Sequence, residues 1–160
     1  MSTQKIEKEA ASQLLDSLYL DMFHLIEDHT QSRINIERTN ASGAILLART
    51  RFQQGGNNSV SVAQIPTKNS TEFNALCRVV SASDEKNGNE ISIERHAVEK
   101  STGYVEPLNW FSVLPPMSLR QAASTFKDCI ELLAESANLQ RQLDAIINNI
   151  SSMKQFIIKQ

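Results

Sequence analysis

Aromatic residues and turn-forming residues are scarce in this chain of 160 residues. Only 6% of the residues are aromatic, and there are 5 glycines and 4 prolines. An all-β sandwich needs a thick core and many tight turns, so this composition argues against that class. Hydrophobic residues make up 41% and charged residues 21%, which is ordinary for a folded protein. We therefore expect a single, mainly helical domain.

The sequence also has no long apolar run and no cluster of basic residues. No apolar stretch approaches the ~20 residues that a membrane-spanning helix needs. Lysine and arginine are spread along a chain whose formal net charge is −2, so neither a nucleic-acid footprint nor a polybasic membrane-binding segment is expected. The N-terminal residues are charged and lack the apolar core of a secretory signal. We expect a soluble protein on the cytosolic side.

Groups that carry chemistry are few and scattered. Cys77 and Cys129 are expected to be unpaired thiols in a reducing compartment, with a disulfide between them as the less favoured alternative. His24 and His29 are five residues apart, which does not place both rings on one helical face, and His96 stands alone. No nucleophile, base and orienting group come together. We therefore expect no catalytic residue, no metal site and no cofactor.

The first half of the chain predicts one long helix, over residues 4–54, because no proline interrupts it. Its residues follow the alternating three- and four-residue spacing of a coiled-coil seam, apolar at the start and smaller or more polar later. The predicted seam positions are Leu15, Leu18, Met22, Leu25, His29, Ser32, Ile36, Thr39, Gly43, Leu46 and Thr50. Gly55 and Gly56 are expected to end the helix.

A second long helix is predicted over residues 117–158. Pro115 and Pro116 block helix before it, and Ser118 with Gln121 is typical of a capping box. The predicted seam positions are Leu119, Ala122, Phe126, Cys129, Leu133, Ser136, Gln140, Leu143, Ile147, Ile150, Lys154 and Ile157. A helix of ~40 residues is ~60 Å long and must pair along its length. We expect the two helices to form an antiparallel coiled-coil hairpin within one chain.

The connection between the helices, residues 55–115, is expected to hold a small irregular or β-hairpin insertion. Residues 76–80 and 91–94 read as two short strands, with Asn87-Gly88 as a turn signal between them. Val60, Val62 and Ile65 predict a short extended piece. The polar residues 82–90 and 96–104 are expected to be mobile.

One apolar segment, residues 106–116, stands out in this connection. It contains three prolines and the only tryptophan of the chain. In one interpretation Trp110 and Phe111 fold back and plug the end of the hairpin core. In the other they anchor a partner, since large aromatic side chains dominate interface energetics. Residue type alone favours the plug, and the two roles are compatible where one ring face stays exposed.

The same segment resembles a known family. The matching residues are Glu106, Pro107-Leu108-Asn109-Trp110-Phe111, Ser118-Leu119-Arg120-Gln121-Ala122 and Phe126, with a weaker match at Leu15–Leu18 and Leu47–Phe52. They resemble the coiled-coil domain-containing protein 115 family, the soluble assembly factors of the vacuolar proton-translocating ATPase (V-ATPase). The chain departs from the pattern at Ser112, where the family often has glycine, and residues 57–105 do not align.

The resemblance implies a non-catalytic assembly chaperone. Such a protein acts at the cytosolic face of the endoplasmic reticulum, and also in later secretory or endosomal compartments. It pairs with an integral membrane assembly factor, helps to build the membrane-embedded proton-conducting sector, and leaves before the mature pump works. The candidate partner-binding residues are Pro107, Leu108, Asn109, Trp110, Phe111, Leu119, Arg120 and Gln121.

Two other functions remain open from the sequence. The first is a coiled-coil tether or scaffold subunit of a trafficking complex, which has no need for the Trp110-Phe111 segment. The second is a small enzyme with a site in residues 57–105, which the lack of a convergent polar set disfavours.

Overall fold

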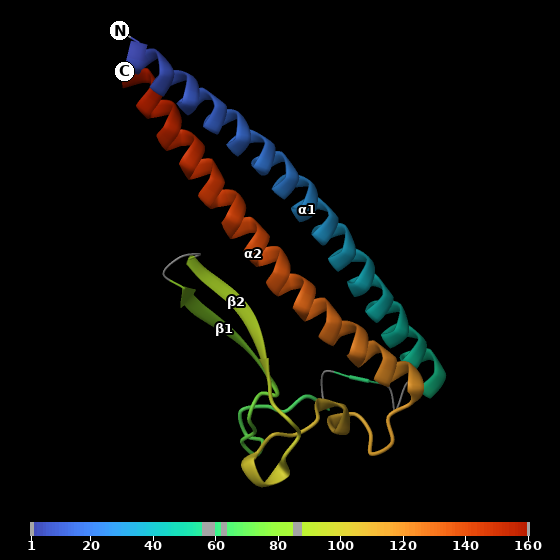
Figure 1. Ribbon diagram of the computed structural model, residues 1–160. Helices are drawn as coiled ribbons and strands as arrows, with labels where there is room; N and C mark the ends of the chain where they lie inside the picture. The colour runs from blue at the N-terminus through green and yellow to red at the C-terminus, as the bar shows by residue number, and fades with distance from the viewer. Residues whose placement is uncertain (1, 56–59, 62–63, 85–87, 160) are drawn as a thin grey trace. The chain divides into compact units, whose positions relative to one another are not determined.

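The computed structural model describes residues 2–55, 60–61, 64–84 and 88–159. In chain order these form α1 (Ser2–Gln54), β1 (Cys77–Asp84), β2 (Gly88–Arg95), the 3-10 helices η2 (Lys100–Thr102) and η3 (Pro107–Trp110), and α2 (Met117–Lys159) (Figure 1). The prediction of two long helices with a small β insertion between them is confirmed. Among these described residues, no helix is apolar enough over a sufficient length to cross a membrane.

The chain divides into two compact units. Unit 1 comprises Met1–Ile34 and Glu135–Gln160, and unit 2 comprises Asn35–Ala134. In unit 1 the core includes Ala11 and Ile150, and the Lys154 ammonium lies 5.2 Å from the centre of the Tyr19 ring. The β hairpin, both 3-10 helices and the segment singled out from the sequence all belong to unit 2.

The burial of α1 follows the predicted spacing. Every predicted seam position is buried or half-buried, whereas the flanking Phe23 and Ile26 are exposed. The helix ends where predicted, because Gly55 has a φ of +68°, the left-handed conformation that glycine adopts without strain. Gly56 lies outside the described residues.

The predicted seam of α2 is wrong at alternate positions after Cys129. The exposed positions are Leu133, Gln140, Ile147 and Lys154, and the half-buried residues each precede them by one: Leu132, Leu139, Ile146 and Met153. Leu132-Leu133 and Ile146-Ile147 are apolar pairs, so hydrophobicity alone fits either spacing. The positions shared by both spacings, such as Ala122 and Ile150, are buried as predicted.

The predicted capping box at Ser118 is also wrong. Ser118 lies inside the first turn of α2, where it is buried and accepts a hydrogen bond from Thr50 Oγ1 at 2.8 Å. The helix starts instead from the carbonyl of Pro116, which accepts hydrogen bonds from the Leu119 and Arg120 amides at 3.0 and 3.1 Å. The Ser118 hydroxyl therefore joins the two helices and does not cap one of them.

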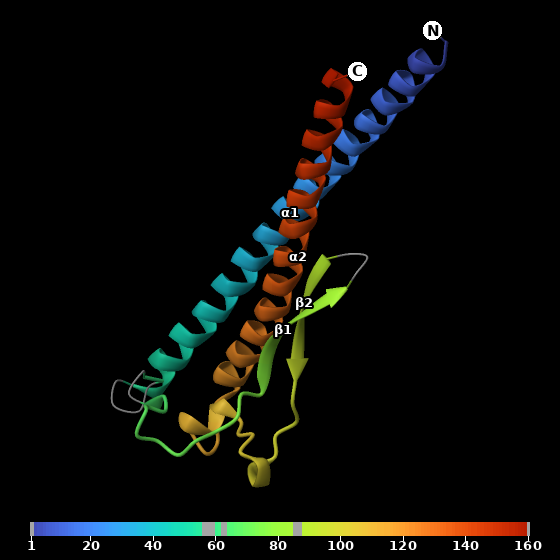
Figure 2. The same ribbon diagram turned by 90° about the vertical axis from the view of Figure 1, so that its left-hand side faces the viewer.

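Within unit 2 the two helices lie side by side with opposite chain directions (Figures 1 and 2). Thr50 of α1 meets Ser118 near the start of α2, and further along α2 the Cys129 sulfur lies 3.9 Å from the carbonyl oxygen of Ile36. Residue numbers thus fall along α1 as they rise along α2. Between these contacts the Phe126 ring lies against Gly43, and a Cβ there would be only 2.8 Å from the ring.

The two strands form an antiparallel sheet with a register running from Cys77↔Arg95 to Asp84↔Gly88. They are longer than predicted, since residues 82–84 and 88–90, expected to lie outside the strands, belong to them. Backbone hydrogen bonds continue the ladder through small and polar residues, which hydrophobic alternation does not reveal. Asn87 of the predicted turn lies outside the described residues.

The remaining connection is a set of turns. Of the predicted extended piece near Val60, Val62 lies outside the described residues, and the Gln64 amide donates to the Ser61 carbonyl at 3.1 Å. Residues 96–104, also expected to be mobile, contain η2 and Gly103 with a φ of +82°.

The antiparallel contact predicts a specific cross-link. Thr50→Cys with Ser118→Cys replaces two oxygens that lie 2.8 Å apart, so the two thiols should oxidise to a disulfide within one chain. Non-reducing electrophoresis and mass spectrometry in a Cys77→Ser background will measure it. Cross-links found only between chains would contradict the in-chain pairing, and Thr50→Cys with Arg141→Cys is the negative control.

Candidate partner-binding segment

The segment before α2 owes its shape to its prolines. Pro107 occupies the start of η3, where its fixed φ suits a helix and its missing N–H leaves no donor unpaired. The turn is held by hydrogen bonds from the Asn109 amide to the Glu106 carbonyl and from the Phe111 amide to the Leu108 carbonyl, both at 3.1 Å. Trp110 and Phe111 are therefore presented from a rigid turn.

Trp110 is half-buried in this arrangement. Its ring packs edge-on against Phe73, with ring centres 5.1 Å apart and planes at 66°. The neighbouring Asn109 is exposed. Part of the indole thus packs inward and part remains accessible, which is compatible with both interpretations weighed from the sequence.

Phe111 and Leu108 border an apolar pocket of about 330 Å³. The pocket is lined by Leu47, Arg51, Val60, Ser61, Ile65, Glu106, Pro107, Leu108, Phe111, Leu119, Ala123, Phe126 and Lys127. The Phe111 carbonyl also accepts a hydrogen bond from the Gln64 side-chain amide at 3.4 Å. The segment thus contacts Gln64, from an earlier part of the connection, and shares a pocket with residues of α2.

A second pocket, of about 630 Å³, lies at the base of the β hairpin and shares Phe126 with the first. Cys77, His96, Trp110 and Phe126 are among its lining residues. The His96 ring stacks on Tyr104 at 4.8 Å. Its Nε2 atom is buried without a hydrogen-bond partner and lies 3.7 Å from Glu94 Oε1. Histidine here is a packing residue of the hairpin base.

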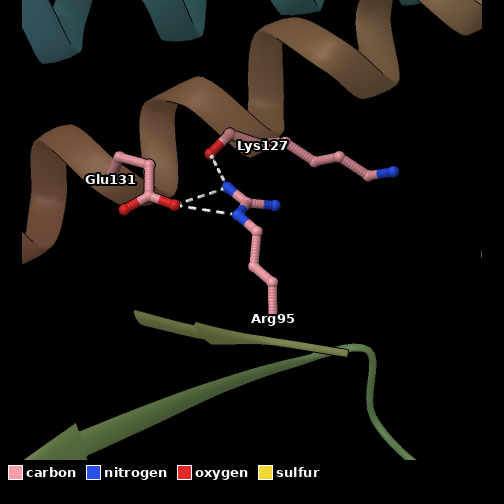
Figure 3. A network of polar contacts seen from close by, with 3 residues as sticks. All are labelled: Arg95, Lys127 and Glu131. Atoms are coloured by element: carbon pink, nitrogen blue, oxygen red, sulfur yellow. Dashed lines mark hydrogen bonds and ion pairs between the residues drawn. The ribbon is translucent and has the colours of Figure 1, made fainter. Parts of the chain in front are cut away.

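Ion pairs hold the hairpin and the segment on α2. Figure 3 shows the Arg95 guanidinium from the end of β2 reaching Glu131, at 2.7 Å from Nη2, and the Lys127 carbonyl, at 3.0 Å. The Lys127 ammonium lies 3.5 Å from Glu106 Oε1, directly before η3. These groups are partly exposed, so each pair contributes about 0–1 kcal/mol and serves mainly to fix orientation.

Most of the predicted residues line one of the two pockets, and the others differ in how deeply they are buried. Pro107, Leu108, Phe111 and Leu119 line the first pocket and Trp110 lines the second. Leu119 is only 3% exposed, so it supports the segment from beneath. Arg120 and Gln121 are exposed on the first turns of α2.

Sequence reasoning missed the residues that hold the segment in place. Phe73 and Gln64 come from the connection that could not be aligned, and no local pattern links them to Trp110 or Phe111. For the ion pair of Lys127 with Glu106, the sequence pointed to one partner only, since Glu106 is part of the family motif.

The described residues offer no group of three or more His, Cys, Asp or Glu side chains placed to hold a metal ion. Cys77 is a half-buried free thiol and Cys129 a buried one. The chemistry of this region is that of apolar and aromatic contact.

Comparisons with known proteins give the relationship. The chain is 28% identical over 151 residues to the vacuolar ATPase assembly protein VMA22 of Homo sapiens, covering 81% of this chain and 83% of the human protein. It is 26% identical, in an alignment of 167 positions, to the protein of that name from Mus musculus, covering 90% of this chain and 88% of the mouse protein. This chain is thus similar over most of its length to proteins named vacuolar ATPase assembly proteins.

The family resemblance inferred from the sequence is thereby confirmed. A VMA22 protein of Bos taurus is 46% identical over a shorter stretch of 37 residues, 23% of this chain and 21% of the bovine protein. No protein-family profile matches the chain. The VMA22 relatives are named for assembly and not for a reaction, which agrees with the absence of a catalytic pattern in the sequence.

The close approach at Gly43 predicts an unusual effect of substitution. In an exposed helix interior, glycine to alanine stabilises by about 1 kcal/mol. Here the new Cβ meets the Phe126 ring at 2.8 Å, so Gly43→Ala should destabilise unit 2 by about 1–2 kcal/mol, as overpacked cores do. Chemical denaturation followed by circular dichroism will measure the change.

Two further variants separate the clash from other effects of Gly43→Ala. Ser42→Ala, at an exposed neighbouring position, should change the free energy of unfolding by less than about 0.5 kcal/mol. Phe126→Leu should lower the free energy of unfolding less in the Gly43→Ala background than in the parent chain, because the smaller side chain relieves the clash. A gain in stability from Gly43→Ala would show that the helices do not approach as described.

Proposed function

We propose that the chain is a non-catalytic assembly chaperone for the membrane-embedded proton-conducting sector of the vacuolar H⁺-ATPase. It acts with an integral membrane assembly factor at the cytosolic face of the endoplasmic reticulum, and it is absent from the mature pump. The observation that carries the proposal is the similarity to vacuolar ATPase assembly proteins over most of the chain.

In this proposal α1 and α2 pair as an antiparallel coiled-coil hairpin. The contacts within unit 2 and the burial of alternate three- and four-residue positions on α1 support that packing. A hairpin of this kind supplies a long scaffold but few concave sites for catalysis. In this role the chain binds an incomplete subunit more tightly than the finished assembly. It promotes assembly only through this difference in affinity, because a binder shifts an equilibrium by no more than that.

The proposed partner-binding surface is the segment Pro107–Phe111 with Arg120 and Gln121 at its rim. The proline-started turn lowers the entropy lost when the segment is ordered by a partner. Trp110 is half-buried, so its indole is already positioned for contact. Aromatic anchors of this type account for much of the energy of protein interfaces.

Trp110→Ala tests the surface. Losing a central aromatic anchor costs about 2–4 kcal/mol of binding, so the variant should recover much less of the membrane-bound assembly factor and proton-sector subunits from detergent-solubilised membranes. Quantitative mass spectrometry of affinity-purified full-length chain measures the recovery. Phe23→Ala, an exposed aromatic of α1 in unit 1, is the matched control and should recover them normally.

A second variant guards against an effect on folding. Arg120→Ala with Gln121→Ala alters two exposed residues, so helical circular dichroism and the melting temperature should stay unchanged while recovery falls. If Trp110→Ala melts early and the Arg120/Gln121 variant binds normally, the segment is a plug of the core. Recovery of mature trafficking complexes in place of pump subunits would favour a tether.

A further inference from the structure

Four large apolar side chains stand exposed where α1 ends and α2 begins. They are Phe52 (89% exposed), Val113 (91%), Leu114 (87%) and Met117 (64%). The Thr50–Ser118 hydrogen bond holds the end of α1 beside the start of α2, and the loop carrying Val113 and Leu114 lies at that same end in both views (Figures 1 and 2). We call these four residues the apolar tip.

The loop of the tip is a short bend between two rigid elements. Val113 and Leu114 stand between η3 and the Pro115-Pro116 pair, and the Leu114 amide donates to the Ser112 hydroxyl at 3.2 Å. The two prolines fix the backbone after the loop. Val113 and Leu114 are both almost fully exposed, and exposed apolar side chains that adjoin one another mark interaction sites more often than single ones do.

Basic residues predominate in the segments that make this end, where the Glu106 carboxylate is paired with Lys127 at 3.5 Å. Residues 38–71 contain no acidic residue but include Arg38, Arg49, Arg51 and Lys68, and residues 107–127 contain Arg120 and Lys127 with no acid. Arg49, Arg51 and Arg120 lie within a few residues of the tip and are exposed, and Arg51 Nε donates a hydrogen bond to the Val60 carbonyl at 3.2 Å. The chain as a whole is slightly acidic, with a net charge of −2, so this end differs in sign from the rest.

We propose that the apolar tip inserts into the interface of an anionic lipid bilayer, with the flanking arginines bound to lipid headgroups. Apolar side chains beside basic residues are the chemistry by which peripheral proteins enter the headgroup–acyl boundary. Arginine stems also reach along such a surface while the guanidinium stays at the headgroups. The inference is independent of the proposed function, because it needs no protein partner.

Vesicle flotation of the purified full-length chain tests the inference. The chain should float with vesicles of phosphatidylcholine and phosphatidylserine, and much less with vesicles of phosphatidylcholine alone, and high salt should weaken the binding. Val113→Asp with Leu114→Asp should reduce the bound fraction by about tenfold or more, because charged side chains oppose insertion and anionic headgroups repel them. Circular dichroism should not change, since both positions are exposed.

Val79→Asp is the matched control, since Val79 is 69% exposed on β1 and away from the tip in sequence. It should bind vesicles like the parent chain. Equal binding by the tip variant and the control, or no flotation with anionic vesicles, would overturn the inference. The inference would also be overturned if the parent chain did not bind vesicles and the tip variant lost protein partners, because the tip would then be a protein interface. Trp110→Ala should still float, so failure of the proposed function and failure of this inference give different results.

Discussion

The contact between the Phe126 ring and the bare backbone of α1 at Gly43 is the packing constraint on which unit 2 depends. A side chain at Gly43 would meet the ring at 2.8 Å, so the two helices approach this closely only because glycine has no Cβ. Phe126 also lines both the pocket under Phe111 and the pocket under Trp110. The ring therefore sets the helix spacing on one side and supports the candidate partner-binding segment on the other. The Thr50–Ser118 hydrogen bond fixes the same pair of helices at the end from which that segment leaves.

The features predicted well from the sequence are those with a local signature. The two helices are bounded by Gly55 and by the Pro115-Pro116 pair, and every predicted seam residue of α1 is buried or half-buried. The failures occur where two local choices are nearly equal. Leu132 and Leu133 fit alternative registers, and only packing against a neighbour distinguishes them. Ser118 has the sequence of a cap but forms its bond with Thr50, a partner 68 residues away that no local pattern identifies.

The candidate segment was found from its motif, but its surroundings were not. Phe73, Gln64 and Lys127 hold it through a ring contact, an amide and an ion pair that join distant parts of the chain. A two-stranded sheet alone is marginally stable in water, and here Arg95 ties its end to Glu131 and to the backbone of α2. The region therefore consists of rigid pieces fastened to one helix by a few replaceable contacts.

The most direct test of this account is complementation in cells from which their own vacuolar ATPase assembly protein has been removed. The measurement is ATP-driven proton uptake by isolated vacuolar or lysosomal membranes, together with the protein content of the purified pump. The account predicts that expressing this chain restores proton uptake while the mature pump contains none of it. Expression of a folded chain that leaves proton uptake absent, or its stable retention in the mature pump, would contradict the assembly role.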